Sequence, residues 1–422
     1  MPPLLIRNAR VLTIGGASGP RRGAAMRDLG VLPRADVLLD GGRIVKIDAP
    51  PGTASLGSYQ PDPTLTYIDA KDSVLMPGFV DCHTHMCWAG SRIDEWERRL
   101  AGKSYIEIMQ AGGGIMSTVR AVRETVTGIL GAGVEDRARQ ALKLGSTTVE
   151  VKSGYGLNAE SELKMLDAIR NARGRCRLTL VPTALLGHAI DAHVPGGAEG
   201  FVSDTLECTL PAVSESYGNS IAIDAFCETG AWSKDQCVRL FERARDLGHP
   251  IRVHTDQFTS LGMIPEAIRL NARSVDHLEA ATDADLAAVA RSRTIGVLLP
   301  CTGFHLDGRY AKARPIIDAG GAVAIATNAN PGSSPCLSMP MAIALAVRNC
   351  GMTVAEAIIA ATVNAAAVLD LPDRGYIAPG ARADLILLRD TDERVLAYEY
   401  GDDPVETVIV GGEIVKRSGT ER

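Results

Sequence analysis

Short apolar runs alternate with amphipathic stretches through the middle of the chain, from about residue 73 to residue 375. Between the apolar runs lie helical patterns, which are clearest at 159–172, 233–248 and 283–292. Strand and helix repeated over this length predict an α/β fold, a (β/α)8 TIM-like barrel, although the periodicity alone also fits a doubly wound sheet. The apolar runs are short, end in polar residues, and occupy 74–85, 147–154, 178–185, 222–228, 250–256, 274–278, 294–300 and 322–328.

Both ends of the chain show a different pattern, in which strands follow one another without long helices between them. Two of the four apolar segments are interrupted by a Gly–Gly pair, which is typical of a hairpin turn. We therefore expect one small β-sandwich domain built from residues 1–72 and 376–422, beside a catalytic barrel domain at 73–375. The four segments are 4–14, 36–48, 383–390 and 406–419.

The composition is that of a globular enzyme. Hydrophobic residues make up 46% and charged residues 22% of the 422 residues, and the formal net charge is −6. This acidic balance provides no field that attracts phosphates, so we expect no nucleic-acid partner and no membrane partner. No stretch approaches the roughly 20 apolar residues of a membrane helix. The start lacks a signal-peptide pattern, and the nine cysteines form no Cys-x-x-Cys pair, so we expect a cytoplasmic protein.

Four of the eight histidines lie where apolar runs of the middle segment end. His83 and His85 follow the first run, and their spacing places both imidazoles on one side of an extended chain. His254 and His277 end two later runs, and Asn328 ends the last one. In a barrel of parallel strands these ends meet at one face, where active sites are built. The pattern indicates a metal site, because imidazole nitrogens are typical ligands of zinc and related metals.

A single histidine at a strand end is more often a hydrogen-bonded structural residue than a ligand. The combination is more specific, because a His-x-His pair follows one strand and single histidines follow two later strands of an eightfold pattern. We therefore expect one divalent metal, and a site with three histidines favours Zn or Fe over Mg or Ca.

Two motifs resemble the amidohydrolase superfamily. MPGFVDCHTH at 76–85 resembles the segment in which His-x-His ends the first barrel strand, and GYIAPGARADLILL at 375–388 resembles the return to the β-sandwich. Further segments resemble the imidazolonepropionase family within it, so that the resemblance covers nearly the whole chain. These segments are 89–108, 111–123, 147–166, 224–233, 253–258, 276–279 and 330–335.

The resemblance implies which side chains bind the metal and act in the reaction. His277 matches the histidine that hydrogen-bonds the attacking water or the substrate carbonyl, and Gln257 matches a polar residue at the substrate ring. His277, Gln257 and Asn328 are therefore the expected catalytic residues. The matched ligand positions are His83, His85, His254 and Asn328.

The same resemblance implies a pocket for a small substrate that carries a carboxylate. Arg92 and Tyr155 match the pair that holds this carboxylate, a role that suits the planar fork of arginine. Without the resemblance they would be interpreted as a solvated charge and a loop anchor. The glycines at 112–114 indicate a tight turn rather than a phosphate cradle, since no P-loop lysine follows them. The other expected substrate contacts are His188, Gln257, Asn330, Gly332 and Ser333.

Asn328 departs from the family pattern, in which an aspartate ends the last barrel strand. Asparagine offers a carbonyl oxygen but no charge, and it cannot act as a base near neutral pH. Proton transfer would then fall to Asp256, His277 or Glu279.

The segment after the third predicted strand also departs from the family pattern. Its spacing allows either His188 or His193 to be the histidine that contacts substrate. We favour His188, because it lies nearer to the end of the strand.

The resemblance therefore implies a metal-dependent hydrolase that opens the cyclic amide of 4-imidazolone-5-propanoate to give N-formimino-L-glutamate, and it implies a homodimer. One alternative is another cyclic-amide hydrolase or a deaminase on the same scaffold, since a fold does not determine a substrate. A nucleobase substrate of such a deaminase would lack the carboxylate that Arg92 and Tyr155 would bind. A second alternative, which Asn328 favours, is a catalytically impaired homologue that binds a metabolite.

Overall fold

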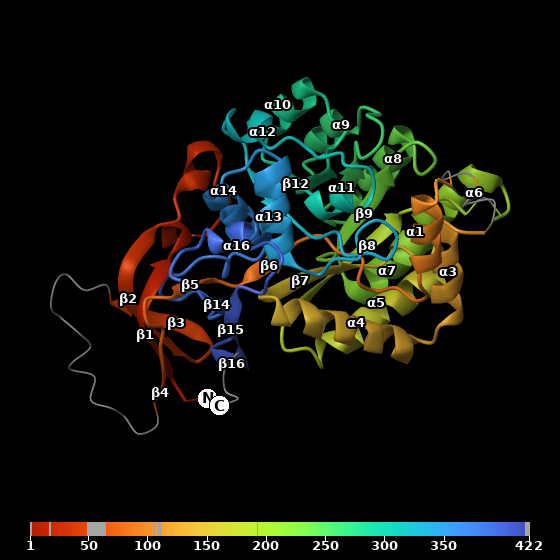
Figure 1. Ribbon diagram of the computed structural model, residues 1–422. Helices are drawn as coiled ribbons and strands as arrows, with labels where there is room; N and C mark the ends of the chain where they lie inside the picture. Colours follow the sequence, from red (N-terminus) through yellow and green to blue (C-terminus); the bar gives the residue numbers. More distant parts are fainter. Residues whose placement is uncertain are drawn as a thin grey trace.

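Two eight-stranded sheets organise the chain in the computed structural model, which describes residues 2–16, 18–48, 65–103, 107, 112–191 and 193–417. The middle of the chain forms one of them, which we call the barrel sheet. Strands from both ends of the chain form the other, the terminal sheet. In Figure 1 the terminal sheet, with its red and deep-blue strands, lies beside the barrel.

The barrel sheet consists of parallel strands that follow one another in sequence order from β6 to β13. Beyond the ends of β6 and β13 the barrel is closed by a parallel bridge between Thr84 and Ala329. The amide of Asn328 donates to the carbonyl oxygen of His83 at 3.0 Å across the same junction. This strand order confirms the predicted barrel and excludes the doubly wound alternative. The strands are β6 (Phe79–Asp81), β7 (Ser146–Lys152), β8 (Thr179–Gly187), β9 (Ala222–Cys227), β10 (Arg252–Thr255), β11 (Ser274–His277), β12 (Ile295–Leu298) and β13 (Val323–Ile325).

Helices connect the barrel strands and surround the barrel in Figure 1. Most of them bury one face, as amphipathic helices of an α/β barrel do, although the helix at 93–100 has no buried residue. Several begin at a side-chain cap, for example α8, where Ser233 and Gln236 form a capping box. The helices are α1 (Ile93–Leu100), α3 (Ile115–Glu124), α4 (Thr127–Lys143), α5 (Ala159–Arg173), α6 (Gly197–Asp204), α7 (Leu210–Tyr217), α8 (Lys234–Asp246), α9 (Met263–Arg269), α10 (Asp283–Arg291), α11 (Pro300–His305), α12 (Arg314–Ile317), α13 (Met339–Asn349), α14 (Val354–Ala360), α15 (Val363–Val368) and α16 (Val395–Tyr398).

The terminal sheet joins segments far apart in the sequence, in the order β16-β15-β14-β5-β1-β2-β3, with β4 beside β1. The hairpin of β2 and β3 also bonds to the segment that leads into β14, since Ile44 donates to the carbonyl of Ala381 at 2.9 Å. The sheet thereby encloses a small apolar core of its own. The strands are β1 (Leu4–Leu12), β2 (Val31–Asp40), β3 (Arg43–Asp48), β4 (Thr66–Asp69), β5 (Val74–Pro77), β14 (Leu385–Leu388), β15 (Val405–Val410) and β16 (Glu413–Arg417).

The apolar run at 74–85 differs from the single strand that its pattern predicts. Its first part, β5, pairs with β1 and β14 in the terminal sheet, and its second part, β6, pairs with β7 in the barrel. Gly78 separates the two, and a Cβ there would lie 2.3 Å from Thr147 Cγ2. The chain therefore passes from one sheet to the other at a point where only glycine fits.

The division into residues 1–72 with 376–422 and a barrel at 73–375 remains a proposal, and residues 49–64 and 418–422 of it lie outside the described residues. Among the helices that the structure describes, none has the length and apolar character to cross a bilayer.

Candidate active site

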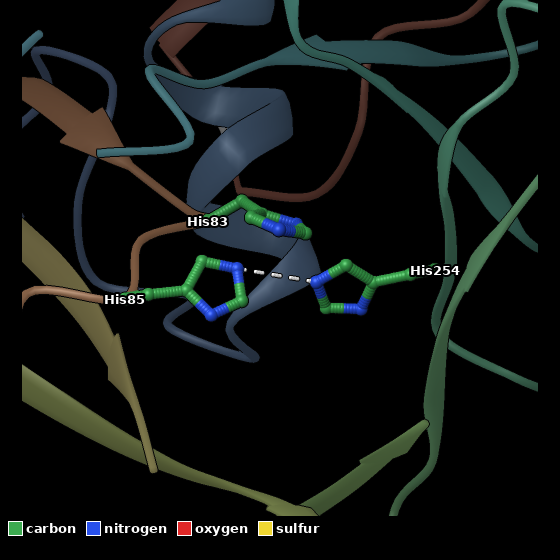
Figure 2. A group of neighbouring side chains, drawn as sticks. All are labelled: His83, His85 and His254. Atoms are coloured by element: carbon green, nitrogen blue, oxygen red, sulfur yellow. Dashed lines mark hydrogen bonds between the residues drawn. The ribbon is translucent and has the colours of Figure 1, made fainter. Parts of the chain in front are cut away.

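Three buried histidines meet at the carboxyl end of the barrel strands. His83 and His85 follow β6, and His254 lies in β10. One nitrogen from each ring can be chosen so that all three lie within 4.8 Å of one another. Figure 2 shows the rings facing a common point, and the Nε2 atoms of His85 and His254 are 3.3 Å apart. The ring nitrogens therefore converge as ligands of one metal ion do.

Two carboxylates orient the ring nitrogens that point away from this centre. Asp276 Oδ2 lies 2.6 Å from His83 Nδ1, and Asp224 Oδ1 lies 3.1 Å from His254 Nδ1. A proton held on Nδ1 by a carboxylate leaves the Nε2 lone pair available for a metal. His83 Nε2 is buried and has no protein partner, as that arrangement requires.

The same carboxylates belong to a buried ionic network inside the barrel. Lys152 Nζ lies 2.7 Å from Glu150 Oε1 and 2.8 Å from Asp224 Oδ2. Arg252 Nη2 lies 2.7 Å from Asp276 Oδ2, and its Nη1 contacts Glu150. All five side chains are at most 1% exposed. Buried charges require such pairing, since an isolated one would be strongly destabilising.

Burial favours the neutral form of His83, His85 and His254. Burial lowers the pKa of His83 and of His85 well below the usual 6.5, and it also lowers the pKa of His254. Burial alone would raise the pKa of Asp224, but its contacts with His254 and Lys152 hold it well below the ordinary value. Neutral imidazoles backed by ionised carboxylates are the state that binds metal.

Asn328 lies at the end of β13 with a left-handed backbone, φ +55°. Its Nδ2 donates to Thr302 Oγ1 at 2.8 Å, and the side-chain oxygen, Oδ1, is buried without a protein partner. An unpaired buried oxygen beside the junction of β6 and β13 fits a neutral ligand or a hydrogen-bond acceptor.

His277 lies at the end of β11, on the same face of the barrel as the three histidines. Its ring centroid lies 5.6 Å from that of His254 and 5.9 Å from that of His83. Glu279 Oε1 lies 3.4 Å from His277 Nδ1, and the backbone at His277 has a φ of +88°. Backbone strain of this kind at a non-glycine residue is typical of functional sites.

A cavity of about 620 Å³ lies next to the histidines. Its wall contains every substrate contact expected from the sequence: Arg92, Tyr155, His188, Gln257, Asn330, Gly332 and Ser333. The rings of His188 and His85 are stacked with centroids 5.0 Å apart, which joins the cavity to the histidine cluster. Burial lowers the pKa of His188 to about 3, so this ring is neutral as well.

The remaining candidates from the sequence are His193, Asp256 and Glu279. Of the two alternative histidines, His188 lines the cavity, and His193 is not among its lining residues. Asp256 is buried beyond β10, and burial raises the pKa of its carboxyl. Asp256, Glu279 and His277 are all absent from the lining residues of the cavity. Glu279 is the candidate acid whose carboxylate contacts His277.

Sequence reasoning missed the residues that hydrogen-bond the histidines and Asn328 on the side away from the cluster. Asp224 and Asp276 lie within barrel strands, and Thr302 lies in the first turn of α11, the helix after β12. The available signal was a charged side chain inside an otherwise apolar strand, as in AIDAF and SVDH. Glu95 and Arg99 also line the cavity, and they were missed because α1 carries several exposed charges of the same kinds.

Comparison with known proteins places this geometry in context. Residues 74–415 match the sequence profile of the amidohydrolase family. An imidazolonepropionase from Herpetosiphon aurantiacus is 43% identical over 423 residues, which cover 98% of this chain and 97% of the relative. An imidazolonepropionase from Deinococcus radiodurans is 42% identical over 93% of this chain and 95% of the relative.

Solved structures share the fold at low sequence identity. The 5-methylcytosine deaminase of Klebsiella pneumoniae has a TM-score of 0.72 at 18% identity, with 99% of this chain and 98% of that chain covered. An adenosine deaminase of Xanthomonas campestris with bound zinc has a TM-score of 0.68 at 18% identity, with coverages of 98% and 93%. At such identities the likeness concerns the architecture alone.

Proposed function

We propose a function from the premise that this chain belongs to the imidazolonepropionase family of the amidohydrolases, with which it aligns over nearly its full length. It is a hydrolase of a cyclic amide C–N bond, and its substrate is 4-imidazolone-5-propanoate. The ring carbonyl carbon gains the oxygen of water and becomes a carboxylate. The ring C–N bond breaks, and the nitrogen takes up a proton, which gives N-formimino-L-glutamate.

The observation that carries this proposal is the juxtaposition of the histidine cluster with an arginine-lined cavity. His83, His85 and His254 converge at one point, and the stacked His188 leads from there into the cavity. A scaffold for a neutral nucleobase would not need the two arginines that line this cavity. The geometry thus fits a small ring that carries a carboxylate tail.

The residues at the cluster fit a divalent metal. His83 Nε2 and Asn328 Oδ1 are both buried without protein partners, and neutral imidazoles with carboxylates behind them favour Zn or Fe. We assign His83, His85 and His254 as the ligands, with Asn328 as a neutral fourth. When bound, such a metal supplies Lewis-acid chemistry, which activates water and polarises a carbonyl.

The substrate is held by the wall of the cavity. Tyr155 is 4% exposed, and burial raises the pKa of its phenol, so it stays a neutral hydrogen-bond donor for a carboxylate. Gln257 and His188 would lie beside the substrate ring. Their neutral side chains suit the polar edge of an imidazolone.

His277 moves the proton. Its Nδ1 faces Glu279, which leaves Nε2 for the reacting groups. From there an imidazole can take a proton from the attacking water and return it to the leaving nitrogen. Asn328 cannot take that proton, because an amide is not a base near neutral pH. We therefore assign the pair of His277 and Glu279 to proton transfer, Gln257 to ring contact, and Asn328 to the metal.

Turnover and metal content of the same sample test this function. We expect about one Zn or Fe per chain. We also expect conversion of 4-imidazolone-5-propanoate to N-formimino-L-glutamate, which chromatography of the reaction mixture measures. His254→Ala should lose the metal and the activity together, while His193→Ala, a histidine outside the cavity lining, should retain both. A metal-loaded protein that leaves this compound intact but opens or deaminates a ring without a carboxylate would contradict the proposal.

Three finer points belong to the same proposal. Elemental analysis of protein isolated without added metal decides between Zn and Fe. We also propose a cytoplasmic homodimer, as the family resemblance implies. Sedimentation at micromolar concentration checks the dimer, and a single species of about 45 kDa, the mass of one chain, would contradict it.

A further inference from the structure

Two guanidinium groups meet at the backbone of Gly332 on the cavity wall. A Cβ on Gly332 would lie 3.3 Å from Arg92 Nη1 and 3.5 Å from Arg92 Cζ, so the guanidinium of Arg92 lies directly against this residue. Arg99 lies about two turns further along α1, on the same side as Arg92, and donates through Nη2 to the carbonyl oxygen of Gly332 at 2.9 Å. The two cations therefore lie on one small part of the wall.

Arg92 is already occupied by a carboxylate of the protein. Its Nε donates to Glu95 Oε2 at 2.6 Å, and its Nη2 donates to Glu95 Oε1. Glu95 also accepts from the amide of Gly114 at 2.9 Å. The Arg92 and Glu95 side chains are each 11% exposed. The forked edge of Arg92, with which arginine binds a carboxylate through two hydrogen bonds, is thus used within the protein.

Arg99 has no such partner. Its Nε is buried and makes no hydrogen bond, and no ion pair among the described residues includes it. The other carboxylates of the cavity wall are engaged elsewhere: Glu228 accepts from the amide of Phe258 at 2.8 Å, and Asp307 pairs with Arg309 at 2.6 Å. Burial lowers the pKa of Arg99, and the nearby charge of Glu95 offsets this only in part.

We propose that Arg99 is the specificity-determining cation that binds the substrate carboxylate, and that Glu95 holds Arg92 beside it in a rigid ion pair without net charge. Arg92, Arg99 and Glu95 together carry one net positive charge, which matches a ligand with one carboxylate. This assignment rests on the proposed function, and it adds a residue to the carboxylate site rather than replacing Arg92.

The test measures charge discrimination without turnover. Imidazole-4-propanoate and imidazole-4-propanamide differ only in the charge of the tail, and neither contains the amide that is hydrolysed. Their affinities for the metal-loaded protein are measured by titration calorimetry. The ratio of the two dissociation constants reports how well the protein recognises the carboxylate, whatever a substitution does to ring binding.

We expect Arg99→Met to reduce the preference for the carboxylate by about 10- to 100-fold, because a charge-assisted hydrogen bond is lost. The affinity for the carboxamide should stay nearly constant, which also shows that the variant is folded. Arg99→Lys should keep part of the preference. Arg98→Met is the matched control, since Arg98 is exposed on the same helix and is absent from the cavity wall.

Glu95→Gln in the Arg99→Met background separates this role from a merely structural one. Removal of the Glu95 charge releases Arg92, so the double variant should regain at least about tenfold of the lost preference. An Arg99→Met variant that retains the full preference would overturn the assignment while leaving the proposed function intact. A wild-type protein that binds neither compound, or both equally, would overturn both.

Discussion

Asn328 Nδ2 donates to the hydroxyl oxygen of Thr302 at 2.8 Å, and this bond determines which end of the amide is left unpaired. Because the nitrogen is used by Thr302, the oxygen is the atom without a protein partner. An aspartate at this position could accept from the same hydroxyl, since a hydroxyl group can donate as well as accept. The site is therefore built to take either residue, and the difference between them is one unit of charge.

Asn328→Asp should strengthen metal binding and speed up the reaction. The carboxylate adds a charged ligand and a group that can accept a proton, so we expect at least about tenfold higher metal affinity and a kcat higher by about 100-fold. Chelator competition and steady-state kinetics measure the two. Asn271→Asp, an exposed position that also has a left-handed backbone, is the control and should change neither. Equal metal affinity in wild type and Asn328→Asp would mean that residue 328 does not contact the metal.

Asp276→Asn should weaken metal binding by about 10- to 100-fold, because the carboxylate behind a metal-binding histidine orients its ring and raises its basicity. Asp276 Oδ2 lies 2.6 Å from His83 Nδ1 and 2.7 Å from Arg252 Nη2. The variant should also unfold at a lower temperature without metal, since Arg252 loses one of its partners. Asp283→Asn, in an exposed ion pair with Lys312, should change neither property. Unchanged metal affinity in the first variant would refute the orienting role of Asp276.

Glu356→Gln should make the free energy of unfolding less dependent on pH in the acidic range. Glu356 is buried and receives Arg27 Nε at 2.9 Å and Arg314 Nη2 at 2.8 Å. Burial alone would raise the pKa of this carboxyl, but its hydrogen bonds with Thr353, Arg27 and Arg314 hold it below the ordinary 4.5. A lowered pKa in the folded state means that its stabilisation is complete above about pH 4.5 and is lost as the pH falls through the folded-state value.

The variant should therefore be less stable by about 1.5–3 kcal/mol at pH 7, and this difference should shrink as the pH falls below about 4.5. Denaturant unfolding at several pH values measures it. Glutamine keeps the capping box of α14, so the difference reports the charge. Glu266→Gln removes a partly exposed partner of Arg269 and should have little effect at any pH. A difference for Glu356→Gln that stays constant from pH 7 to pH 3 would contradict the assignment.

Gly78→Ala should strain the passage between the two sheets. The added methyl group would lie 2.3 Å from Thr147 Cγ2 and 2.5 Å from Thr147 Oγ1, so β6 or β7 would have to shift. We expect a loss of about 1–3 kcal/mol in the free energy of unfolding. Gly128→Ala, at an exposed position in α4 where a Cβ meets nothing within 4 Å, should be neutral or slightly stabilising. Equal effects of the two substitutions would show that the passage tolerates a side chain.

Much of this protein was readable from local sequence. The strands and helices followed from hydrophobic periodicity, and the histidines of the cluster followed from their places at the ends of β6, β10 and β11. The run at 74–85 is the instructive exception. Its residues have strand character throughout, but whether one strand or two results depends on which partners they meet, and β1, β14 and β7 are distant in the sequence.

The sequence by itself predicted the alternating strands and helices, the β-rich ends and the histidine pattern, because periodicity and motifs are properties of neighbouring residues. The residues expected at the substrate cavity came from the family resemblance. Only the tertiary structure decided the partners of those residues. His83 and Asp276 are separated by 193 positions, and Arg99 and Gly332 by 233. Contacts over such separations arise only when the barrel closes. Which carboxylate orients a ligand, and which arginine is left for a substrate, therefore depends on the folded arrangement of charges.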